Sequence, residues 1–399
     1  MANKNPYILM YRDEEVLSFE VVSGENRVIE MKERLSGYDK APIKLGKKAP
    51  GEDSIVDLHG FLMKRSISAN RSDYQEILSH TGFSSGLELS LQGHGLSLSD
   101  HYWYKREGEN LRYSDINFFQ NKWDDSFARA VLSGNYEELS HVDLNVPDIV
   151  TQGWSIKGWL YGEKGSKLYK LGIQKDHCEE CLAEVLTSKL ANRLFGEGKA
   201  VGYELERVYG RYASASKVMI GIGEDMLSLS TFLPSELHAI LRKQDEDVKY
   251  VKEFLSKISG YNFPGLYDFF VKALCLRSLS FLNDFHFDNI SFIRNKETGE
   301  RRIAPLYDLA NSFGSSENAQ AMLSSINKAT YLFIFYYYGR LDADWDYSWY
   351  DPHSLDGFEE QIRETLSKSD FYTQELLDNI IEVYRYQKST LDSLREKKS

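Results

Sequence analysis

Apolar and polar residues alternate along the first stretch of the chain, from Tyr7 to Val21, with Asp13-Glu14-Glu15 near its centre. Alternation with a period of two is typical of a strand that buries one face, and an acidic centre suits a turn. The pattern therefore predicts a two-stranded hairpin close to the start of the chain.

Two short apolar groups follow a polar stretch at residues 37–53. The first runs from Ile55 to Leu62 and the second from Tyr74 to Leu78, and both have the spacing of one face of a helix. We expect two short helices, which together with the hairpin form an N-terminal accessory region.

From residue 151 the pattern becomes that of strands. WSIKGWLYG and KLYKLGI flank a turn at 163–166 and predict a second hairpin. The segment from Glu179 to Leu194 repeats apolar residues on one side, with acids near its start and a glycine after its end, which predicts a helix. Two strand-like segments, GYELERVYG and RYASASKVMIGI, come next. Strand pair, helix and strands is the order of a small nucleotide-binding lobe.

Helical periodicity dominates after residue 245. Four segments have this period: 248–255, 266–279, 358–366 and 376–394. The whole pattern predicts an α+β protein with three parts, namely an N-terminal accessory α/β domain at 1–145, a β-rich nucleotide-binding lobe at 146–240 and a helical catalytic lobe at 241–399.

Composition indicates how large a core the chain can bury and argues against nucleic acid and membrane as direct partners. With 399 residues, 42% of them hydrophobic, the chain can bury a large core. A net charge of -12 argues against direct nucleic-acid binding, because binding driven by counterion release needs a surplus of Lys and Arg on one face. The longest apolar run starts at Tyr331 and is far shorter than the roughly 20 residues of a membrane-spanning helix. We expect neither nucleic acid nor membrane as a direct partner.

Three cysteines, Cys178, Cys181 and Cys275, are too few for a disulfide framework, and the first residues lack the layout of a secretion signal. The expected location is the cytoplasm. Cys178 and Cys181 lie beside His177 and could suggest a zinc site, but the sequence has no second cysteine pair to complete four ligands. Ordinary, partly buried thiols are expected instead.

Polar residues with catalytic potential lie between two apolar blocks, in LNDFHFDNISFI at 282–293, and Asp308 follows in IAPLYDLANS. Phosphoryl transfer needs a carboxylate to orient and accept a hydroxyl proton, and oxygen ligands to hold Mg²⁺ on the nucleotide phosphates. Asp284 and Asn289 supply a carboxylate and a neutral carbonyl of that kind, and Asp308 supplies a further ligand. The alternative is a loop whose polar groups cap the neighbouring backbone.

The segment D-F-H-F-D-N at 284–289 resembles the D-x-H-x-x-N catalytic loop shared by HipA-like kinases and relatives of the phosphoinositide 3-kinases. PLYDLANS resembles the HipA-like version, because Tyr307 precedes the acid and no Phe-Gly follows it. The resemblance implies a two-lobed protein-kinase-like fold with ATP and Mg²⁺ as cofactors. The implied roles are Asp284 as catalytic base, His286 as a loop-shaping residue at the cofactor-binding site, and Asn289 and Asp308 as metal ligands.

Upstream, GWSIKGWLYGEKGSKLYKLG resembles the phosphate loop, hairpin and lysine strand of the same family. Residues 151–158 would then form the loop over the phosphates. The implied nucleotide contacts within it are Gly153, Ser155 and Lys157. Relatives are regulated by phosphorylation of a serine in this loop, which makes Ser155, or Thr151 in second place, the expected site of self-phosphorylation.

The resemblance also implies that Lys170 contacts the α- and β-phosphates and that Glu184, on the helix that follows, pairs with it. Lys157 and Lys167 are alternatives to Lys170. A solvated acidic helix face is the alternative reading of Glu184, and Glu179 or Glu180 could take its place.

The implied function is that of a serine/threonine kinase acting on a protein substrate. Family members are often toxins paired with a DNA-binding antitoxin, so such a partner is an open option. Two rivals remain. A nucleotide-binding regulator without catalysis should have lost one of Asp284, Asn289 and Asp308. A lipid kinase should carry a basic activation segment, whereas residues 309–327 contain no Lys or Arg.

Overall fold

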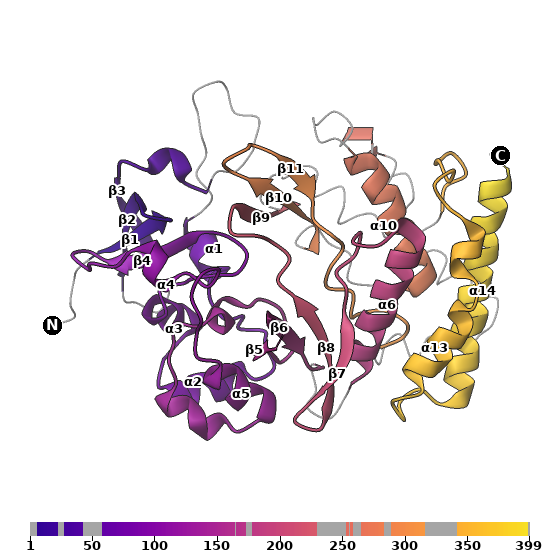
Figure 1. Cartoon of the computed structure of the whole chain (residues 1–399), viewed down its shortest axis with the longest axis horizontal. Helices are drawn as coiled ribbons and strands as arrows, with labels where there is room; N and C mark the ends of the chain where they lie inside the picture. The colour runs from indigo at the N-terminus through magenta and orange to yellow at the C-terminus, as the bar shows by residue number, and fades with distance from the viewer. Residues whose placement is uncertain are drawn as a thin grey trace. The chain divides into compact units, whose positions relative to one another are not determined.

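The chain forms two compact units, seen here in a computed structural model (Figure 1). Unit 1 comprises Met1–Lys175, Lys217–Leu227 and Ile293–Arg302, and unit 2 comprises Asp176–Ser216, Ser228–Phe292 and Ile303–Ser399. The mixture of antiparallel sheets and helices confirms the predicted α+β class. The limits of the three predicted domains stay a prediction. The structure describes residues 6–22, 28–42, 58–163, 165–172, 178–229, 253–254, 256–257, 265–282, 289–315 and 341–397.

Unit 1 begins with a four-stranded sheet in the order β3-β2-β1-β4. The predicted first hairpin is confirmed, since β1 (Tyr7–Tyr11) pairs antiparallel with β2 (Glu14–Val22). β3 (Val28–Arg34) lies beside β2, and β4 (Tyr102–Arg106) pairs antiparallel with β1. Alternate side chains of these strands form one buried face: Leu9, Tyr11, Leu17, Phe19, Tyr102 and Tyr104.

Short helices accompany this sheet. The two predicted ones are α1 (Leu58–Met63) and α2 (Tyr74–Thr81), and both are confirmed. α2 ends at Gly82 with φ 76°, a left-handed conformation that glycine adopts without steric cost. The sequence had not indicated the other helices of this region: α3 (Gly86–Gln92), α4 (Tyr113–Ile116), α5 (Ser126–Ser133) and the 3₁₀ turns η1 (Tyr38–Lys40), η2 (Tyr136–His141) and η3 (Pro147–Val150).

The predicted second hairpin is formed by β5 (Lys157–Gly162) and β6 (Gly165–Lys170), with Lys157 opposite Lys170. α5 packs against β5 at Gly158. A Cβ atom added there would lie 2.9 Å from the Cβ of Ala128, so glycine is required for this close approach.

A third small sheet has the order β11-β10-β9, from β11 (Arg301–Ile303), β10 (Ser291–Asn295) and β9 (Glu224–Ser228). Asp225 of β9 is fully buried in unit 1. It accepts a hydrogen bond from the hydroxyl of Tyr11 at 3.1 Å, and the ammonium of Lys296 lies 3.5 Å from the same carboxylate. These contacts join the start of the chain to segments more than 200 residues away.

Unit 2 is mainly helical. Its helices confirm three predicted segments and the helix expected at 179–194: α6 (Glu179–Phe195), α10 (Leu266–Ser280), α13 (Phe358–Leu366) and α14 (Gln374–Glu396), with a 3₁₀ turn η5 (Pro352–Leu355). α13 and α14 lie side by side (Figure 1), where the rings of Phe358 and Tyr384 are 5.7 Å apart. Most of the helix expected at 248–255 lies outside the described residues.

The two strands predicted after α6 are β7 (Glu204–Val208) and β8 (Arg211–Lys217), and the structure pairs them antiparallel. Within the described parts of the chain, no helix is both long enough and apolar enough to cross a bilayer.

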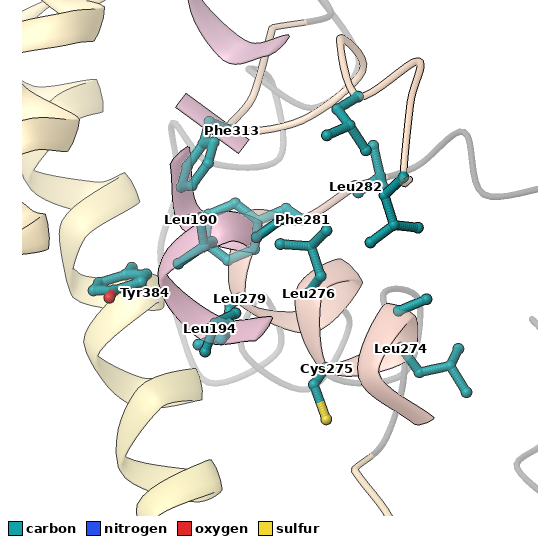
Figure 2. Close-up of a cluster of buried hydrophobic side chains, with 14 of the residues drawn as sticks. Leu190, Leu194, Leu274, Cys275, Leu276, Leu279, Phe281, Leu282, Phe313 and Tyr384 are labelled. Carbon is teal, nitrogen blue, oxygen red and sulfur yellow. The ribbon is translucent and has the colours of Figure 1, made fainter. Parts of the chain in front are cut away.

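The core of unit 2 lies where α6, α10 and α14 meet (Figure 2). Leu190 of α6 and Leu279 of α10 are fully buried in it. Phe281 and Phe313 pack edge to face with ring centres 5.9 Å apart, and the amide of Phe313 donates to the carbonyl of Ser280 at 2.7 Å. This core therefore fixes the end of α10 beside the chain that follows Asp308.

Candidate functional site

The segments that carry the two predicted metal ligands are hydrogen-bonded to each other in unit 2. Asn289 lies two residues before Ser291, and Asp308 directly follows Tyr307. The hydroxyls of Ser291 and Tyr307 are 2.8 Å apart, and the amide of Ala304 donates to the carbonyl of Ser291 at 2.8 Å. The fold thus brings together two short segments whose amide and carboxylate side chains were predicted to hold one metal ion.

Asp308 adopts an unusual backbone conformation. Its φ is 58°, in the left-handed region that costs most residues energy and that Asp and Asn tolerate better than others. Just before it, Leu306 makes an isolated parallel bridge with Ala200. The amide of Asp308 donates to the hydroxyl of Tyr203 at 3.3 Å. A left-handed turn at this position sets the direction in which the side chain leaves the backbone.

The chain after Asp308 is attached to α6. The hydroxyl of Ser312 lies 2.6 Å from that of Thr187 on α6, and it also donates to the carbonyl of Leu309 at 2.8 Å. Both hydroxyl side chains are buried, and a buried hydrogen bond of this kind is costly to break. The helix therefore fixes the position of residues 309–312.

The predicted catalytic base Asp284 and the loop residue His286 lie outside the described residues, so their roles stay predictions. The chain that enters their loop is described. The guanidinium of buried Arg277 donates to the carbonyl of Leu282 at 3.2 Å, and the amide of Leu282 donates back to the carbonyl of Arg277 at 3.1 Å. This reciprocal pair anchors the loop at its first residue.

The predicted nucleotide lysines lie at one end of the hairpin in unit 1. Lys170 is the last residue of β6 and is 8% exposed, and Lys157 opposite it is 5% exposed. The ammonium of Lys157 donates to the carbonyl of Gln152. Gly153 has φ 99°, and a Cβ atom there would lie 2.7 Å from the ammonium of Lys157. Lys157 therefore shapes the loop at 151–158 from within, while Ser155 is half-buried.

Glu184 lies in the middle of α6 and is 1% exposed, and it accepts a hydrogen bond from the hydroxyl of Ser214 on β8. The alternative reading as a solvated acidic helix face is wrong for this residue. Glu179 is buried as well and accepts from the hydroxyl of Ser369. Glu184 belongs to unit 2 and Lys170 to unit 1, and their pairing stays a prediction.

Cys178 and Cys181 of unit 2 lie at the start of α6. Cys178 is half-buried and Cys181 is buried, and burial raises the pKa of both thiols. Across the residues that the structure describes, no group of three or more His, Cys, Asp and Glu side chains is arranged to hold a metal ion. The partial burial predicted for the two thiols is confirmed, and His177 lies outside the described residues.

Comparisons with known proteins find likeness only among solved structures. No protein-family model matches the sequence, and no curated protein matches it. The proinflammatory kinase CtkA of Helicobacter pylori is similar at 14% identity over 62% of this chain and 92% of that chain, with a TM-score of 0.40. HipA of Shewanella oneidensis MR-1, solved with HipB and operator DNA of a toxin-antitoxin system, is similar at 11% identity over 98% of this chain and 99% of that chain, with a TM-score of 0.49. Neither likeness assigns the chain to a family.

Polar contacts around the loop at 151–158 were not found from the sequence. Arg71 is buried and its guanidinium binds the carboxylate of Asp73 with two hydrogen bonds, of 2.6 and 3.1 Å. The same guanidinium donates to the carbonyl of Lys157 at 2.8 Å and to the hydroxyl of Thr151 at 3.2 Å. No sequence pattern pointed to Arg71, because its partners in the loop lie 80 and 86 residues further along the chain.

Asp148 is a second missed residue beside this loop. It is fully buried, and its carboxylate accepts from the amide of Trp159 at 2.8 Å. Burial raises the pKa of Asp148 to about 7, although this hydrogen bond and the nearby charge of Arg71 act to lower it. The carboxyl group therefore titrates near neutral pH.

Proposed function

We propose that this chain is an ATP- and Mg²⁺-dependent protein kinase with a two-lobed kinase-like fold, which transfers phosphate to a serine or threonine hydroxyl. The observation that supports this most is the hydrogen-bonded pair of segments around Ser291 and Tyr307. They carry Asn289 and Asp308, which close the motif that begins at Asp284. The two contacting hydroxyls are 16 residues apart in the chain.

Asn289 and Asp308 fit a magnesium site by the chemistry of their donor atoms. An amide carbonyl and a carboxylate are hard oxygen ligands, and Mg²⁺ commonly takes only one or two of these from a protein and the rest from phosphates and water. When bound, the ion neutralises charge that develops on the transferred phosphoryl group. The left-handed turn at Asp308 would fix the carboxylate toward the ion.

Asp284 is the proposed general base. The substrate hydroxyl oxygen forms a bond to the γ-phosphorus, the bond from that phosphorus to the bridging oxygen of ATP breaks, and ADP leaves. The hydroxyl proton passes to the carboxylate of Asp284. The reciprocal hydrogen bonds between Arg277 and Leu282 would hold the start of this loop while the reaction proceeds.

Lys170 is proposed to contact the α- and β-phosphates, with Glu184 as the carboxylate that orients it. Support comes from burial of both side chains and from the hydrogen bond by which Ser214 fixes Glu184. Gly153, Ser155 and the backbone around Lys157 would lie over the phosphates.

Self-phosphorylation of the same loop is proposed at Ser155. The hydroxyl of Thr151 accepts a hydrogen bond from Arg71 and donates to the carbonyl of Asp148 at 2.7 Å, so its modification would break both. Ser155 and Thr151 are both half-buried, so the hydrogen bonds of Thr151, and not its burial, favour Ser155. A phosphate there adds about 1.5 to 2 negative charges beside the site for ATP, and repulsion would weaken nucleotide binding. Intact-mass and peptide mass spectrometry after incubation with MgATP tests this proposal.

From the HipA-like resemblance we also propose a protein substrate, a cytoplasmic location and an antitoxin-like DNA-binding partner. The experiment that tests the activity is incubation of the purified chain with γ-labelled ATP, Mg²⁺ and cell lysate, beside anionic phosphoinositide vesicles and the Asp284→Asn variant. The proposal is supported if the unaltered chain labels a protein and the Asp284→Asn variant does not. Label on lipid would favour a lipid kinase, and ATP binding with no transfer would favour a regulator.

A further inference from the structure

The loop at 151–158 is hydrogen-bonded to residues 66–73, the chain that leads into α2. The amide of Ser72 donates to the carbonyl of Trp154 at 3.0 Å, at the middle of the loop. The side-chain amide of Gln152 donates to the carbonyl of Ser66. Arg71 reaches the two ends of the loop, through the hydroxyl of Thr151 and the carbonyl of Lys157. All of these groups belong to unit 1.

Arg71 is held so that its contacts with the loop are fixed in direction. Its side chain is fully buried, and the planar guanidinium binds both oxygens of Asp73. The hydroxyl of Tyr136 donates to the same carboxylate at 3.2 Å. A guanidinium fixed in this way presents its remaining N–H groups at defined positions, because the five donors of the side chain lie in one plane.

The loop contacts of Arg71 combine with contacts inside the loop. Gly153 has φ 99°, and the ammonium of Lys157 occupies the space where a side chain at Gly153 would lie. The bond from Lys157 to Gln152 then closes the loop across its own backbone. Bonds at both ends of this short loop, at its middle and across its interior restrict its shape.

We propose that Arg71 is a positioning residue that holds the loop at 151–158 in the shape that receives the nucleotide phosphates. The N-terminal region would thereby form part of the nucleotide site without contacting the nucleotide. The effect on ATP rests on the proposed kinase function, whereas the effect on the loop does not. A residue that only stabilised unit 1 would leave the loop's own exchange and the KM for ATP unchanged.

The first experiment measures the loop without nucleotide. Hydrogen exchange followed by mass spectrometry reports the amide of Ser72, whose acceptor is Trp154 in the loop, and the amides of 151–158. We expect Arg71→Ala and Thr151→Val to raise exchange in these two peptides, with the larger effect in Arg71→Ala. Unchanged exchange in both variants would overturn the proposal.

Two control variants separate positioning from stability and from charge. Leu17→Ala removes a fully buried side chain from the sheet of unit 1 and should lower the unfolding midpoint while leaving loop exchange unchanged. Arg106→Ala removes an exposed positive charge whose guanidinium lies over the ring of Tyr7, and it should change neither. If Leu17→Ala raises loop exchange as much as Arg71→Ala, Arg71 has only a general structural role.

The second experiment measures steady-state kinetics of phosphate transfer. Loss of two charge-assisted hydrogen bonds to the loop in Arg71→Ala should raise the KM for ATP about tenfold, with a smaller change in kcat. Arg71→Lys keeps the charge without the planar fork and should fall between Arg71→Ala and the unaltered chain. Thr151→Val loses one hydrogen bond and should raise the KM for ATP about threefold. This variant keeps the proposal testable if Arg71→Ala fails to fold.

The outcomes for the two proposals are distinct. An unaltered chain that neither binds nor uses ATP contradicts the kinase function, while increased loop exchange in Arg71→Ala would still support the positioning role. An active chain in which Arg71→Ala and Thr151→Val keep the KM for ATP contradicts the positioning role alone.

Discussion

At the scale of single residues, the backbone conformation and the side chain of Asp308 both suit its proposed role as a metal ligand. Asp308→Asn keeps the shape of the side chain and the tolerance of φ 58° but removes the charge. We expect the affinity for MgATP to fall about tenfold or more, and a similar fall for Asn289→Ala. Calorimetric titration measures both. Asn311→Ala, three residues further on, is the control. Unchanged affinity in both test variants would rule out the metal site.

Asp284 can be tested against a neighbouring carboxylate in its own loop. Asp284→Asn should lower the rate of phosphate transfer by about 10² to 10⁴ while ATP still binds, because a general base acts mainly in the transition state. Asp288→Asn changes the same charge in the same segment and should keep most of the rate. The measurement is single-turnover transfer of label from ATP. Near-normal turnover of Asp284→Asn, or equal losses in the two variants, would contradict the assignment.

At the scale of elements, α6 carries both structural and proposed catalytic residues. Leu190→Ala removes a fully buried side chain between α6 and α10 (Figure 2) and should cost about 2 to 5 kcal/mol of unfolding free energy. Urea denaturation followed by circular dichroism measures it. Lys189→Ala, an exposed neighbour on the same helix, is the matched control and should change stability by less than about 0.5 kcal/mol. Equal midpoints for the two variants would show that this core does not stabilise α6.

The proposed pairing of Lys170 with Glu184 can be tested by a double-mutant cycle. Lys170→Ala should lower phosphate transfer strongly, Glu184→Ala less so, and the double variant should be little worse than Lys170→Ala alone. Ser214→Ala is informative beside these, because it removes the hydroxyl that donates to Glu184. Additive losses in kcat/KM for Lys170 and Glu184 would mean that the two side chains act independently.

Elements with a clear period could be predicted from the sequence, and elements with distant partners could not. α6 and the hairpin of β5 and β6 follow from local spacing, and the structure has them at the predicted places. β4 was missed because what makes it a strand is pairing with β1, almost a hundred residues earlier. The contacts of Arg71 with the loop were missed for the same reason, since tertiary packing and not local pattern creates them.

For the whole molecule, Asp148 predicts how stability depends on pH. The pKa of Asp148 in the folded protein is about 7, above the ordinary 3.8. The protonated carboxyl group therefore contributes its full stability below pH 3.8, and this contribution is lost as the pH rises through about 7. The charge of Arg71 acts to lower the pKa of Asp148, and the charge of Asp125 acts to raise it. Asp148→Asn cannot ionise, so its urea midpoint relative to the unaltered chain should rise between pH 5 and pH 8. A constant difference over this range would show that Asp148 does not titrate there.

Segments of the two units alternate along the sequence, which has a consequence for synthesis on the ribosome. Unit 1 takes in residues up to Arg302, about three quarters of the way along the chain, and buried Asp225 depends on both Tyr11 and Lys296. A nascent chain is made from its N-terminus at roughly 5 to 20 residues per second, so β1 waits many seconds for its last partners. During that time the early strands are exposed to chaperones and proteases. Ribosome-bound chains that end before residue 290 should therefore be digested more readily in their first 175 residues than chains that end after 302.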